Sequence, residues 1–322
     1  MRAVVQREYG GADKLSVREV PAPMPGKGEV LVRVHGAALD RGTWHLMTGL
    51  PLVVRPFLGL RGPRTQVVGR DVAGVVEAVG LEVDDVSLGD EVIGTADGSC
   101  ADLAVVPVRR LAAKPRGLTF EEAAALPVSG MTALRAVRDA GRVRPGQQVL
   151  VVGASGGVGS YAVQIARAYG AEVTAVCSGA KAETVRGLGA VRVVDYQREE
   201  PGAGGERYDV VIDIGGRRPL RVLRGLLTHT GTLVMVGGEG GGRWLGGLER
   251  QIGGALRSLF VRQRLVMLSA KERAEDMRAL GDLVERGELR PVVDSTWKLE
   301  GVPDAIRRLE DGGVCGKLVV SV

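Results

Sequence analysis

Residues 149–159, which read VLVVGASGGVG, constrain the fold more than any other part of the chain. A strand of apolar residues leads into a glycine-rich turn, and an amphipathic helix follows it. This order of strand, turn and helix is the context that the A-x-G-x-x-G variant of the dinucleotide fingerprint requires. Gly156 would let the backbone approach a pyrophosphate, and Gly159 would let the helix pack closely on the strand. The alternative is a glycine-rich turn without a ligand, but the flanking elements favour a dinucleotide site.

Strands and helices alternate through the middle of the chain. The helix after the glycine turn has one apolar face, made of Val158, Ala162, Ile165, Ala166 and Tyr169. Strands are expected at residues 149–152, 172–177, 191–194, 210–213, 232–236 and 264–268. This alternation predicts an α/β fold with a doubly wound parallel sheet, in which a dinucleotide lies at the carboxyl edge.

The two ends of the chain have a different pattern. Short strands are expected at residues 29–35, 72–80, 91–94 and 103–107, which is typical of a compact β domain or partial barrel. Thr119 and Glu122 form a capping box that opens a helical stretch, Pro127 interrupts it, and a second helix is expected at residues 132–140. A helix at residues 274–284, a strand at 291–293, a short helix at 305–309 and a strand at 317–320 complete the pattern.

Composition and charge exclude several classes of protein. Apolar residues make up 45% of the chain and charged residues 25%, so disorder, collagen and coiled coils are excluded. Aromatic residues make up only 3%, and the net charge of +5 comes mainly from arginines that appear scattered, so no nucleic-acid partner is expected. Three cysteines without a C-x-x-C pair predict neither a disulfide framework nor a zinc motif. Without a membrane-spanning apolar run or a signal-peptide pattern, we expect a cytoplasmic protein with no membrane partner.

The end of the second expected strand bears on the choice between NAD and NADP. An NAD site places Asp or Glu there, where the carboxylate binds the ribose 2′-hydroxyl. Here Ser178 and Lys181 follow the strand, and Glu172 lies at its opposite end. A hydroxyl and an ammonium suit a 2′-phosphate, although Lys181 could also be an ordinary surface lysine. The sequence therefore predicts NADPH as the cofactor.

Motifs along nearly the whole chain resemble those of the quinone oxidoreductases, the zinc-independent, zeta-crystallin-like branch of the medium-chain dehydrogenase/reductase superfamily. The motifs are Gly146-Gln147 leading into Leu150, residues 154–159 with Gln164 and Arg167, and residues 69–76, whose GRDVAGVV is similar to the family's G-x-E-x-A-G-x-V. The others are residues 88–92 (G-D-x-V), residues 130–134 (G-x-T-A), residues 193–196 (D-Y) and residues 316–320 (G-K-x-V). The resemblance implies a GroES-like β-rich catalytic domain formed by residues 1–120 and 269–322. It also implies a Rossmann NADP(H)-binding domain over residues 121–268.

The resemblance further implies cofactor-binding residues. Ser178, Lys181 and Tyr196 are expected at the 2′-phosphate, and Thr132, Gly237 and Gly238 near the nicotinamide. The complete expected set is Thr132, Ala154, Ser155, Gly156, Gly157, Val158, Gly159, Ser178, Lys181, Tyr196, Gly237, Gly238 and Lys317.

The chain departs from the zinc-dependent members of that superfamily. Those members carry Cys where this chain has Asp40 and a His–Glu pair where it has Arg70-Asp71, and their four-cysteine lobe has no counterpart here. A thiolate and an imidazole are therefore missing, and these are ligands that zinc prefers. The three histidines, His35, His45 and His229, form no spaced cluster with a cysteine. No metal site is expected.

The loop at residues 40–45 supplies the candidates for catalysis. Asp40 could orient the nicotinamide ribose or carboxamide, or could cap a helix. His45 could donate a hydrogen bond or a proton, or could simply pack at an interface. Thr43, Trp44 and Arg70 are the expected substrate-pocket residues, and Arg70 could stabilise an oxyanion or pair with an acid.

Without zinc as a Lewis acid, alcohol oxidation is disfavoured, and hydride delivery from NADPH to a quinone or an α,β-unsaturated carbonyl is expected. Two alternatives stay open. One is an enoyl reductase that acts on a natural-product intermediate, and the other is a low-turnover NADPH-binding protein with a sensor, RNA-binding or structural role. The resemblance also implies a homodimer, formed through the edge strand at residues 264–268.

Overall fold

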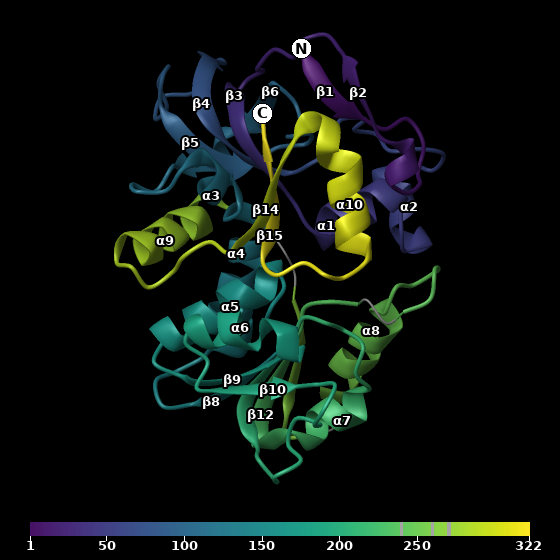
Figure 1. Ribbon diagram of the computed structural model, residues 1–322, viewed down its shortest axis with the longest axis vertical. Coiled ribbons are helices and arrows are strands. Elements are labelled where there is room, and N and C mark those ends of the chain that lie inside the picture. The colour runs from purple at the N-terminus through teal and green to yellow at the C-terminus, as the bar shows by residue number, and fades with distance from the viewer. Residues whose placement is uncertain (239–240, 259–260, 269–271) are drawn as a thin grey trace. The chain divides into compact units, whose positions relative to one another are not determined.

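The computed structural model describes residues 1–238, 241–258, 261–268 and 272–322 of the 322-residue chain (Figure 1). It divides into two compact units, one formed by Met1–Met131 with Lys271–Val322 and the other by Thr132–Ala270. The expected domain boundary at residue 120 differs from this division by eleven residues. The difference arises because α3 (Phe120–Ala124) packs against the strands β3 (Glu29–Leu39), β4 (Asp71–Val79) and β15 (Lys317–Ser321) of the first unit. The capping box of Thr119 and Glu122 at its start is confirmed.

The first unit is built on a seven-stranded sheet to which both ends of the chain contribute. Its strands run in the order β14-β15-β3-β4-β5-β7. Strand β15 pairs with residues 36–39 of β3, and β6 pairs with residues 29–33 of the same strand. Their bounds are Glu29–Leu39 (β3), Asp71–Val79 (β4), Glu91–Thr95 (β5), Leu103–Pro107 (β6), Leu111–Ala113 (β7), Val293–Lys298 (β14) and Lys317–Ser321 (β15). Strand β15 pairs antiparallel with β3, so the purple and yellow ends of the chain share one sheet (Figure 1). A separate hairpin joins β1 (Arg2–Val5) and β2 (Ser16–Glu19).

Several α-helices of the described residues lie wholly in the first unit. They are α1 (Arg41–Thr48), α2 (Arg55–Leu58), α3, α9 (Ala274–Glu285) and α10 (Val302–Glu310). The core between sheet and helices is aliphatic, with residues such as Val32, Leu39 and Ile306 fully buried or nearly so. Because aromatic side chains are scarce, small branched residues fill this core at close packing.

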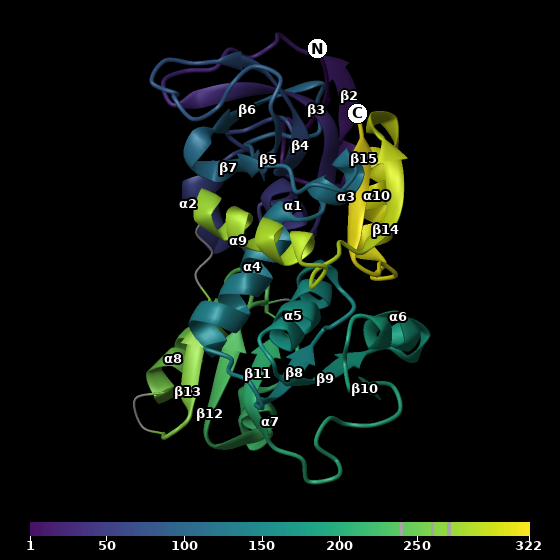
Figure 2. The ribbon, with the colours of Figure 1, turned by 90° about the vertical axis from the view of Figure 1, so that its left-hand side faces the viewer.

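The second unit is a six-stranded parallel sheet in the order β10-β9-β8-β11-β12-β13 (Figure 2). The strands are β8 (Gln148–Val152), β9 (Glu172–Cys177), β10 (Arg192–Asp195), β11 (Tyr208–Asp213), β12 (Leu227–Met235) and β13 (Arg264–Met267). All five pairings are parallel, so every carboxyl end lies at one edge. This confirms the α/β class, with a Rossmann-type sheet and a separate β-rich unit.

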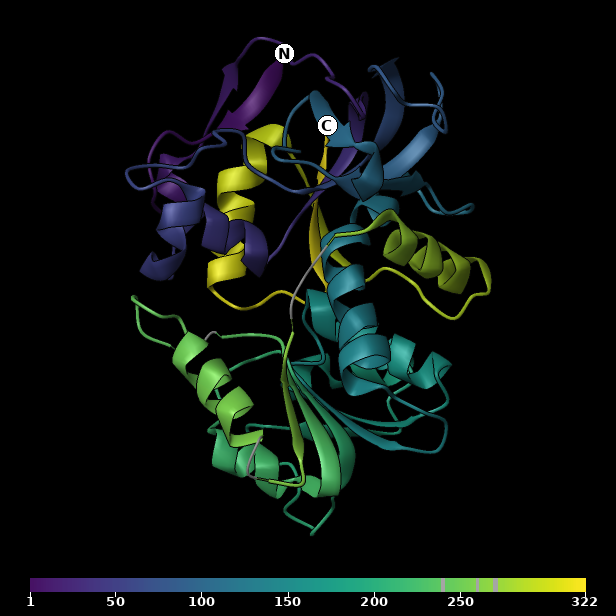
Figure 3. The same ribbon diagram turned by 180° about the vertical axis from the view of Figure 1, so that it is seen from behind.

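Helices cover both faces of this sheet. α5 (Gly157–Ala168) and α6 (Ala182–Gly187) lie on one side, and α7 (Leu220–Gly225) and α8 (Leu248–Arg257) lie on the other (Figure 3). The apolar face of α5 is buried as its spacing predicts, with Ala162, Ile165 and Ala166 fully covered.

Pro127 begins a helix rather than only interrupting one. Helix α4 runs over Pro127–Arg135 and continues as a π-helical segment over Ala136–Gly141, instead of starting at residue 132. Proline suits the first helical position, because its missing N–H would have no partner within the helix there. Gly141 ends the segment, as the sequence predicts.

Candidate active site

The glycine turn after β8 has the local geometry of an anion site. Gly153 has a φ of +86°, and Gly156 is the N-cap of α5, where no side chain caps the helix. A Cβ on Gly159 would lie 2.1 Å from the Gly153 carbonyl oxygen, so only glycine permits this strand-to-helix approach. A Cβ on Gly156 would meet nothing nearer than 3.7 Å, so that side of the turn is open. An open helix N-terminus beside an exposed backbone fits a dinucleotide pyrophosphate.

The residues expected at the 2′-phosphate gather at the carboxyl ends of two neighbouring strands. Ser178 directly follows β9, and Lys181 ends the short 3₁₀ turn Gly179–Lys181. Tyr196 follows β10, is 52% exposed, and donates its backbone N–H to the Cys177 carbonyl at 3.2 Å.

The structure adds a carboxylate here that the sequence analysis did not weigh. A Cβ on Gly179 would lie 2.5 Å from Asp195 Oδ2, so Asp195 lies beside the end of β9. Its Oδ1 accepts the backbone N–H of Gln197 at 3.1 Å, and Arg198 Nε lies 3.6 Å from Oδ2. Asp195 therefore helps to hold the turn that carries Tyr196.

The ends of β11 and β12 hold a second feature that the sequence analysis missed. Asp213, the last residue of β11, is fully buried, pairs with Arg250 of α8, and accepts the Gly216 N–H at 3.2 Å. Burial raises the pKa of the Asp213 carboxyl, and Arg250 opposes that rise. Nη1 of Arg250 is buried without a hydrogen-bond partner among the described residues. Gly237 packs so closely that a Cβ would lie 1.9 Å from the Ile214 carbonyl.

The first unit contains a buried ionic cluster assembled from four distant segments. Lys317 Nζ donates to Asp40 Oδ2 at 2.8 Å, to Asp71 Oδ2 at 2.8 Å and to Ser129 Oγ at 3.2 Å. The Lys317 side chain is 1% exposed, so its three donors are used inside the unit. The structure thus gives Lys317, expected at the cofactor, three partners in the protein interior.

The two carboxyls of this cluster differ in pKa. Burial tends to raise both, but Lys317 and the Thr43 backbone N–H hold the pKa of Asp40 down to about 2. For Asp71, burial dominates over Lys317, and the neighbouring Asp40 adds to it, so its pKa rises to about 6. Burial also raises the pKa of the Cys100 thiol to about 12, which leaves that thiol protonated and unsuited as a nucleophile.

The loop candidates have defined structural partners. Asp40 is the N-cap of α1, because its Oδ1 accepts the Thr43 N–H at 2.9 Å. His45 Nδ1 lies 3.0 Å from the Leu50 carbonyl, so this nitrogen carries the proton. Trp44 Nε1 donates to Glu310 at 2.8 Å. Asp40 thus caps a helix, which is the alternative considered from the sequence.

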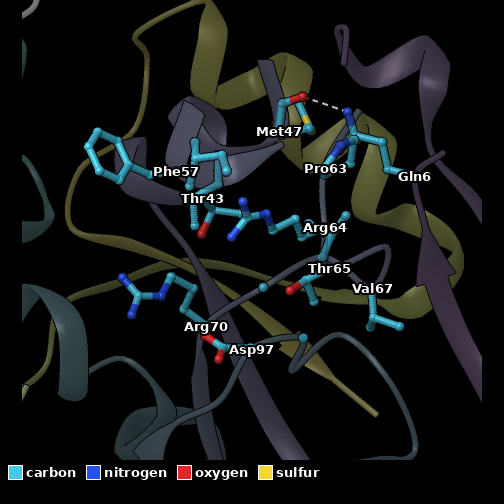
Figure 4. A pocket seen from close by; sticks show the side chains of 15 residues that line it. Gln6, Thr43, Met47, Phe57, Pro63, Arg64, Thr65, Val67, Arg70 and Asp97 are labelled. Atoms are coloured by element: carbon cyan, nitrogen blue, oxygen red, sulfur yellow. Dashed lines mark hydrogen bonds between the residues drawn. The ribbon is translucent and has the colours of Figure 1, made fainter. Parts of the chain in front are cut away.

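A cavity of about 380 Å³ opens in the first unit beside this loop (Figure 4). Thr43 and Arg70 line it, whereas Trp44 and His45 are not among its lining residues. Arg70 pairs with Glu272, which also accepts the Thr95 hydroxyl at 2.8 Å. Apolar side chains, including Leu46, Met47 and Phe57, form much of the wall, as in small-molecule sites.

The donor set in this unit does not match a zinc centre. Asp40, Asp71 and Ser129 offer only oxygens, and the cation they surround is the Lys317 ammonium. Zinc prefers thiolate and imidazole ligands alongside carboxylates. Within the described ranges, no group of three or more His, Cys, Asp or Glu side chains is placed to hold a metal ion.

Comparisons with known proteins agree with this architecture. Residues 26–135 match the model of the alcohol dehydrogenase GroES-like domain, and residues 188–320 match the zinc-binding dehydrogenase model. The chain is 32% identical over 335 residues to the chloroplastic quinone-oxidoreductase QR1 of Triphysaria versicolor, covering 99% of this chain and 98% of that protein. This chain belongs to the medium-chain dehydrogenase/reductase superfamily, among the proteins that resemble quinone oxidoreductases. It is therefore an oxidoreductase of that superfamily.

Solved structures of the superfamily superpose on the whole chain. The quinone oxidoreductase from Coxiella burnetii has a TM-score of 0.85 at 28% identity, and the two chains are covered to 100% and 99%. The mycobacterial protein Rv1454c, solved in complex with NADPH, has a TM-score of 0.84 at 25% identity, and both chains are covered completely. Among the described residues of this superfamily member, no helix combines the length and apolar character needed to cross a membrane.

Proposed function

We propose that this protein is an NADPH-dependent, zinc-independent reductase of quinones or α,β-unsaturated carbonyls. The observation that carries the proposal is the pairing of an open dinucleotide turn with a hydroxyl and an ammonium at the end of β9. A zinc-dependent alcohol oxidation would need ligands that differ from the oxygen donors around Lys317. The names of the relatives and the NADPH-bound neighbour support the same choice of chemistry.

The chain's own residues fit the bound form of such a cofactor. The N-terminus of α5, from Gly156 to Gly159, would hold the pyrophosphate through backbone N–H groups. Ser178 and Lys181 would bind the 2′-phosphate, with Tyr196 directly after the neighbouring strand β10. Bound NADPH supplies the hydride.

The residues of the first unit would position the acceptor. The apolar side chains of the cavity wall would contact a planar acceptor, and the Thr43 hydroxyl already donates to Asp40 Oδ1 at 3.3 Å. His45 in its neutral form uses its N–H on the Leu50 carbonyl. We therefore assign proton delivery to solvent rather than to a dedicated side chain, which suits reduction of an already electrophilic acceptor.

Assembly and location follow as parts of the same proposal. Strand β13 ends the order of the parallel sheet and pairs with β12, which leaves an edge for a second copy of the chain. A homodimer through β13 is proposed on that basis and on the sequence resemblance, and a cytoplasmic location is proposed from the sequence pattern alone.

The test is NADPH oxidation by the purified protein against a panel of quinones and enones, with NADH and an alcohol plus NADP⁺ as controls. We expect acceptor-dependent oxidation of NADPH, and no reduction of NADP⁺ by the alcohol. Tight binding of NADPH without oxidation by any acceptor would instead support a low-turnover binding protein.

A further inference from the structure

The chain contains several basic stretches without acids, and one of them, residues 41–70, lies outside the dinucleotide site. Residues 41–70 contain five arginines and no aspartate or glutamate. These arginines are Arg41, Arg55, Arg61, Arg64 and Arg70. The formal charge of the segment, +5, equals that of the whole chain, so the other residues are balanced overall. The basic excess is therefore less evenly scattered than the sequence analysis assumed.

The same segment builds the cavity of the first unit. Apart from Gln6, Asp97 and Gly98, every residue that lines the cavity comes from residues 41–70. The lining combines aliphatic side chains with arginines, and Phe57 at its margin is 78% exposed. A cavity with apolar walls, two arginines and one acid, Asp97, fits a ligand that is apolar in one part and anionic in another.

Of the charged side chains that line the cavity, Arg64 is the one without an acidic partner in the described structure. Arg70 pairs with Glu272, and Asp97 lies 3.5 Å from Arg110 Nη1. Arg64 instead makes one long contact, from Nη2 to the Pro56 carbonyl at 3.4 Å. Its side chain extends across the cavity between Thr43 and Thr65 (Figure 4).

A neighbouring arginine keeps the potential around Arg64 positive. Arg55 stacks over the Tyr9 ring, with its guanidinium carbon 4.6 Å from the ring centroid, and donates to the Gly49 carbonyl at 3.1 Å. No described carboxylate pairs with Arg55 either. A ligand anion at Arg64 would thus meet a second cation, while Asp97, the acid in the cavity lining, lies beside Arg110.

We propose that the acceptor substrate is an apolar enone or quinone that carries an anionic group, a carboxylate or a phosphate, and that Arg64 binds this group. This proposal rests on the proposed reductase function. The guanidinium fork matches the oxygens of either anion and forms charge-assisted hydrogen bonds. An exposed basic and apolar segment is also a feature of membrane-surface binding. Arg64 lies in a concave cavity of about 380 Å³ rather than on a flat face, which favours the small ligand.

The test compares acceptors that differ only in charge. Benzylideneacetone carrying a para-carboxylate, a para-phosphonate or a para-carboxamide supplies two anions and a neutral control of similar size. We expect kcat/KM for at least one anion to exceed that for the amide about ten-fold or more, as a charged hydrogen bond implies, and Arg64→Met to remove this preference. The better anion identifies the preferred group. Arg116→Met, an exposed arginine of the same unit outside the segment, is the matched control and should keep the preference.

Binding of a non-reducible ligand separates this proposal from the reductase function. The saturated analogue 4-(3-oxobutyl)benzoate and its amide are titrated calorimetrically into wild type and Arg64→Met. If no acceptor is turned over but the acid binds about ten-fold tighter than the amide through Arg64, the reductase function fails and the anion site stands. Equal affinity for acid and amide would overturn the anion site, as would an equal loss of both in Arg64→Met. Sedimentation with anionic lipid vesicles is the third arm, and vesicle binding that depends on Arg64 without any acid preference would also overturn it.

Discussion

The regions around Lys181 and Lys317 received the same assignment from the sequence but have different environments in the structure. Lys181 lies in a short turn directly after β9, at the carboxyl edge of the parallel sheet. Lys317 begins β15 and is enclosed by side chains from Asp40, Asp71 and Ser129. The first position follows from a local signal, a strand end. The second depends on contacts that join residues up to 277 positions apart. A basic residue in a family motif therefore does not reveal whether its charge faces a ligand or the interior.

The largest effect is expected from removing the buried cation. Lys317→Met keeps the length and apolar stem of the side chain but leaves two buried carboxylates without their ammonium. Breaking such a buried pair typically costs about 3–5 kcal/mol of unfolding free energy. Urea unfolding followed by circular dichroism measures this loss. Lys298→Met, at an exposed lysine of the same unit, should unfold like wild type.

A double variant tests whether the loss of stability in Lys317→Met comes from the unpaired carboxylates. Adding Asp71→Asn to Lys317→Met removes one of the stranded charges, so the double variant should recover part of the lost stability. If Lys317→Met unfolds at the wild-type urea concentration, or if the double variant is the less stable of the two, the cluster does not contribute as its geometry indicates.

Most strand positions of the second unit could be predicted because their signals are local. The expected strand at residues 172–177 coincides with β9, and the glycine turn follows β8 as expected. Strand β12 starts five residues before its expected start at residue 232, because the polar stretch that precedes the apolar run also adopts extended backbone. Side-chain pairs such as Asp213–Arg250 could not be predicted from the sequence, because nothing in it links a strand end to one face of a helix 37 residues away.

The buried cluster left one signal in the sequence. Asp71 begins a strand that is otherwise largely apolar, and a buried charged residue in such a place needs a partner. The sequence does not name that partner, because Asp40, Ser129 and Lys317 come from separate elements that only the folded sheet brings together. The cavity was missed for a related reason: residues 51–64 have little regular pattern, and their lack of acids matters only once they enclose a space.

An effect of intermediate size is expected on the KM for NADPH when Lys181 is replaced. Lys181→Glu replaces the expected 2′-phosphate contact by a repelling charge, so KM for NADPH should rise about 10- to 100-fold while KM for NADH changes little. Steady-state kinetics with both cofactors measure the ratio. Lys298→Glu makes the same charge change in the first unit and should leave the ratio unaltered. An equal change in KM for both cofactors would show that Lys181 does not bind the 2′-phosphate.

The smallest effect is expected from the charge balance of the Lys317 cluster. Two carboxylates and one ammonium leave one net negative charge in the interior, and a proton on Asp71 would neutralise it. The folded pKa of Asp71, about 6, lies above its ordinary value of 3.8, so between these values the folded protein holds a proton that the unfolded chain has released. The unfolding free energy should therefore fall as pH rises through this window, by at most about 1.4 kcal/mol per pH unit.

Asp71→Asn tests this sign, because the amide oxygen can still accept the Val128 N–H and Asp40 still pairs with Lys317. Urea unfolding at several values between pH 4 and pH 6 should show a flatter dependence in Asp71→Asn than in wild type. Asp85→Asn, at an exposed position, should keep the wild-type slope. Below about pH 4 both proteins should lose stability, because the pKa of Asp40 is held near 2 and its protonation breaks the remaining pair with Lys317. A wild-type slope in Asp71→Asn would assign the titration to another group and leave Asp71 ionised throughout.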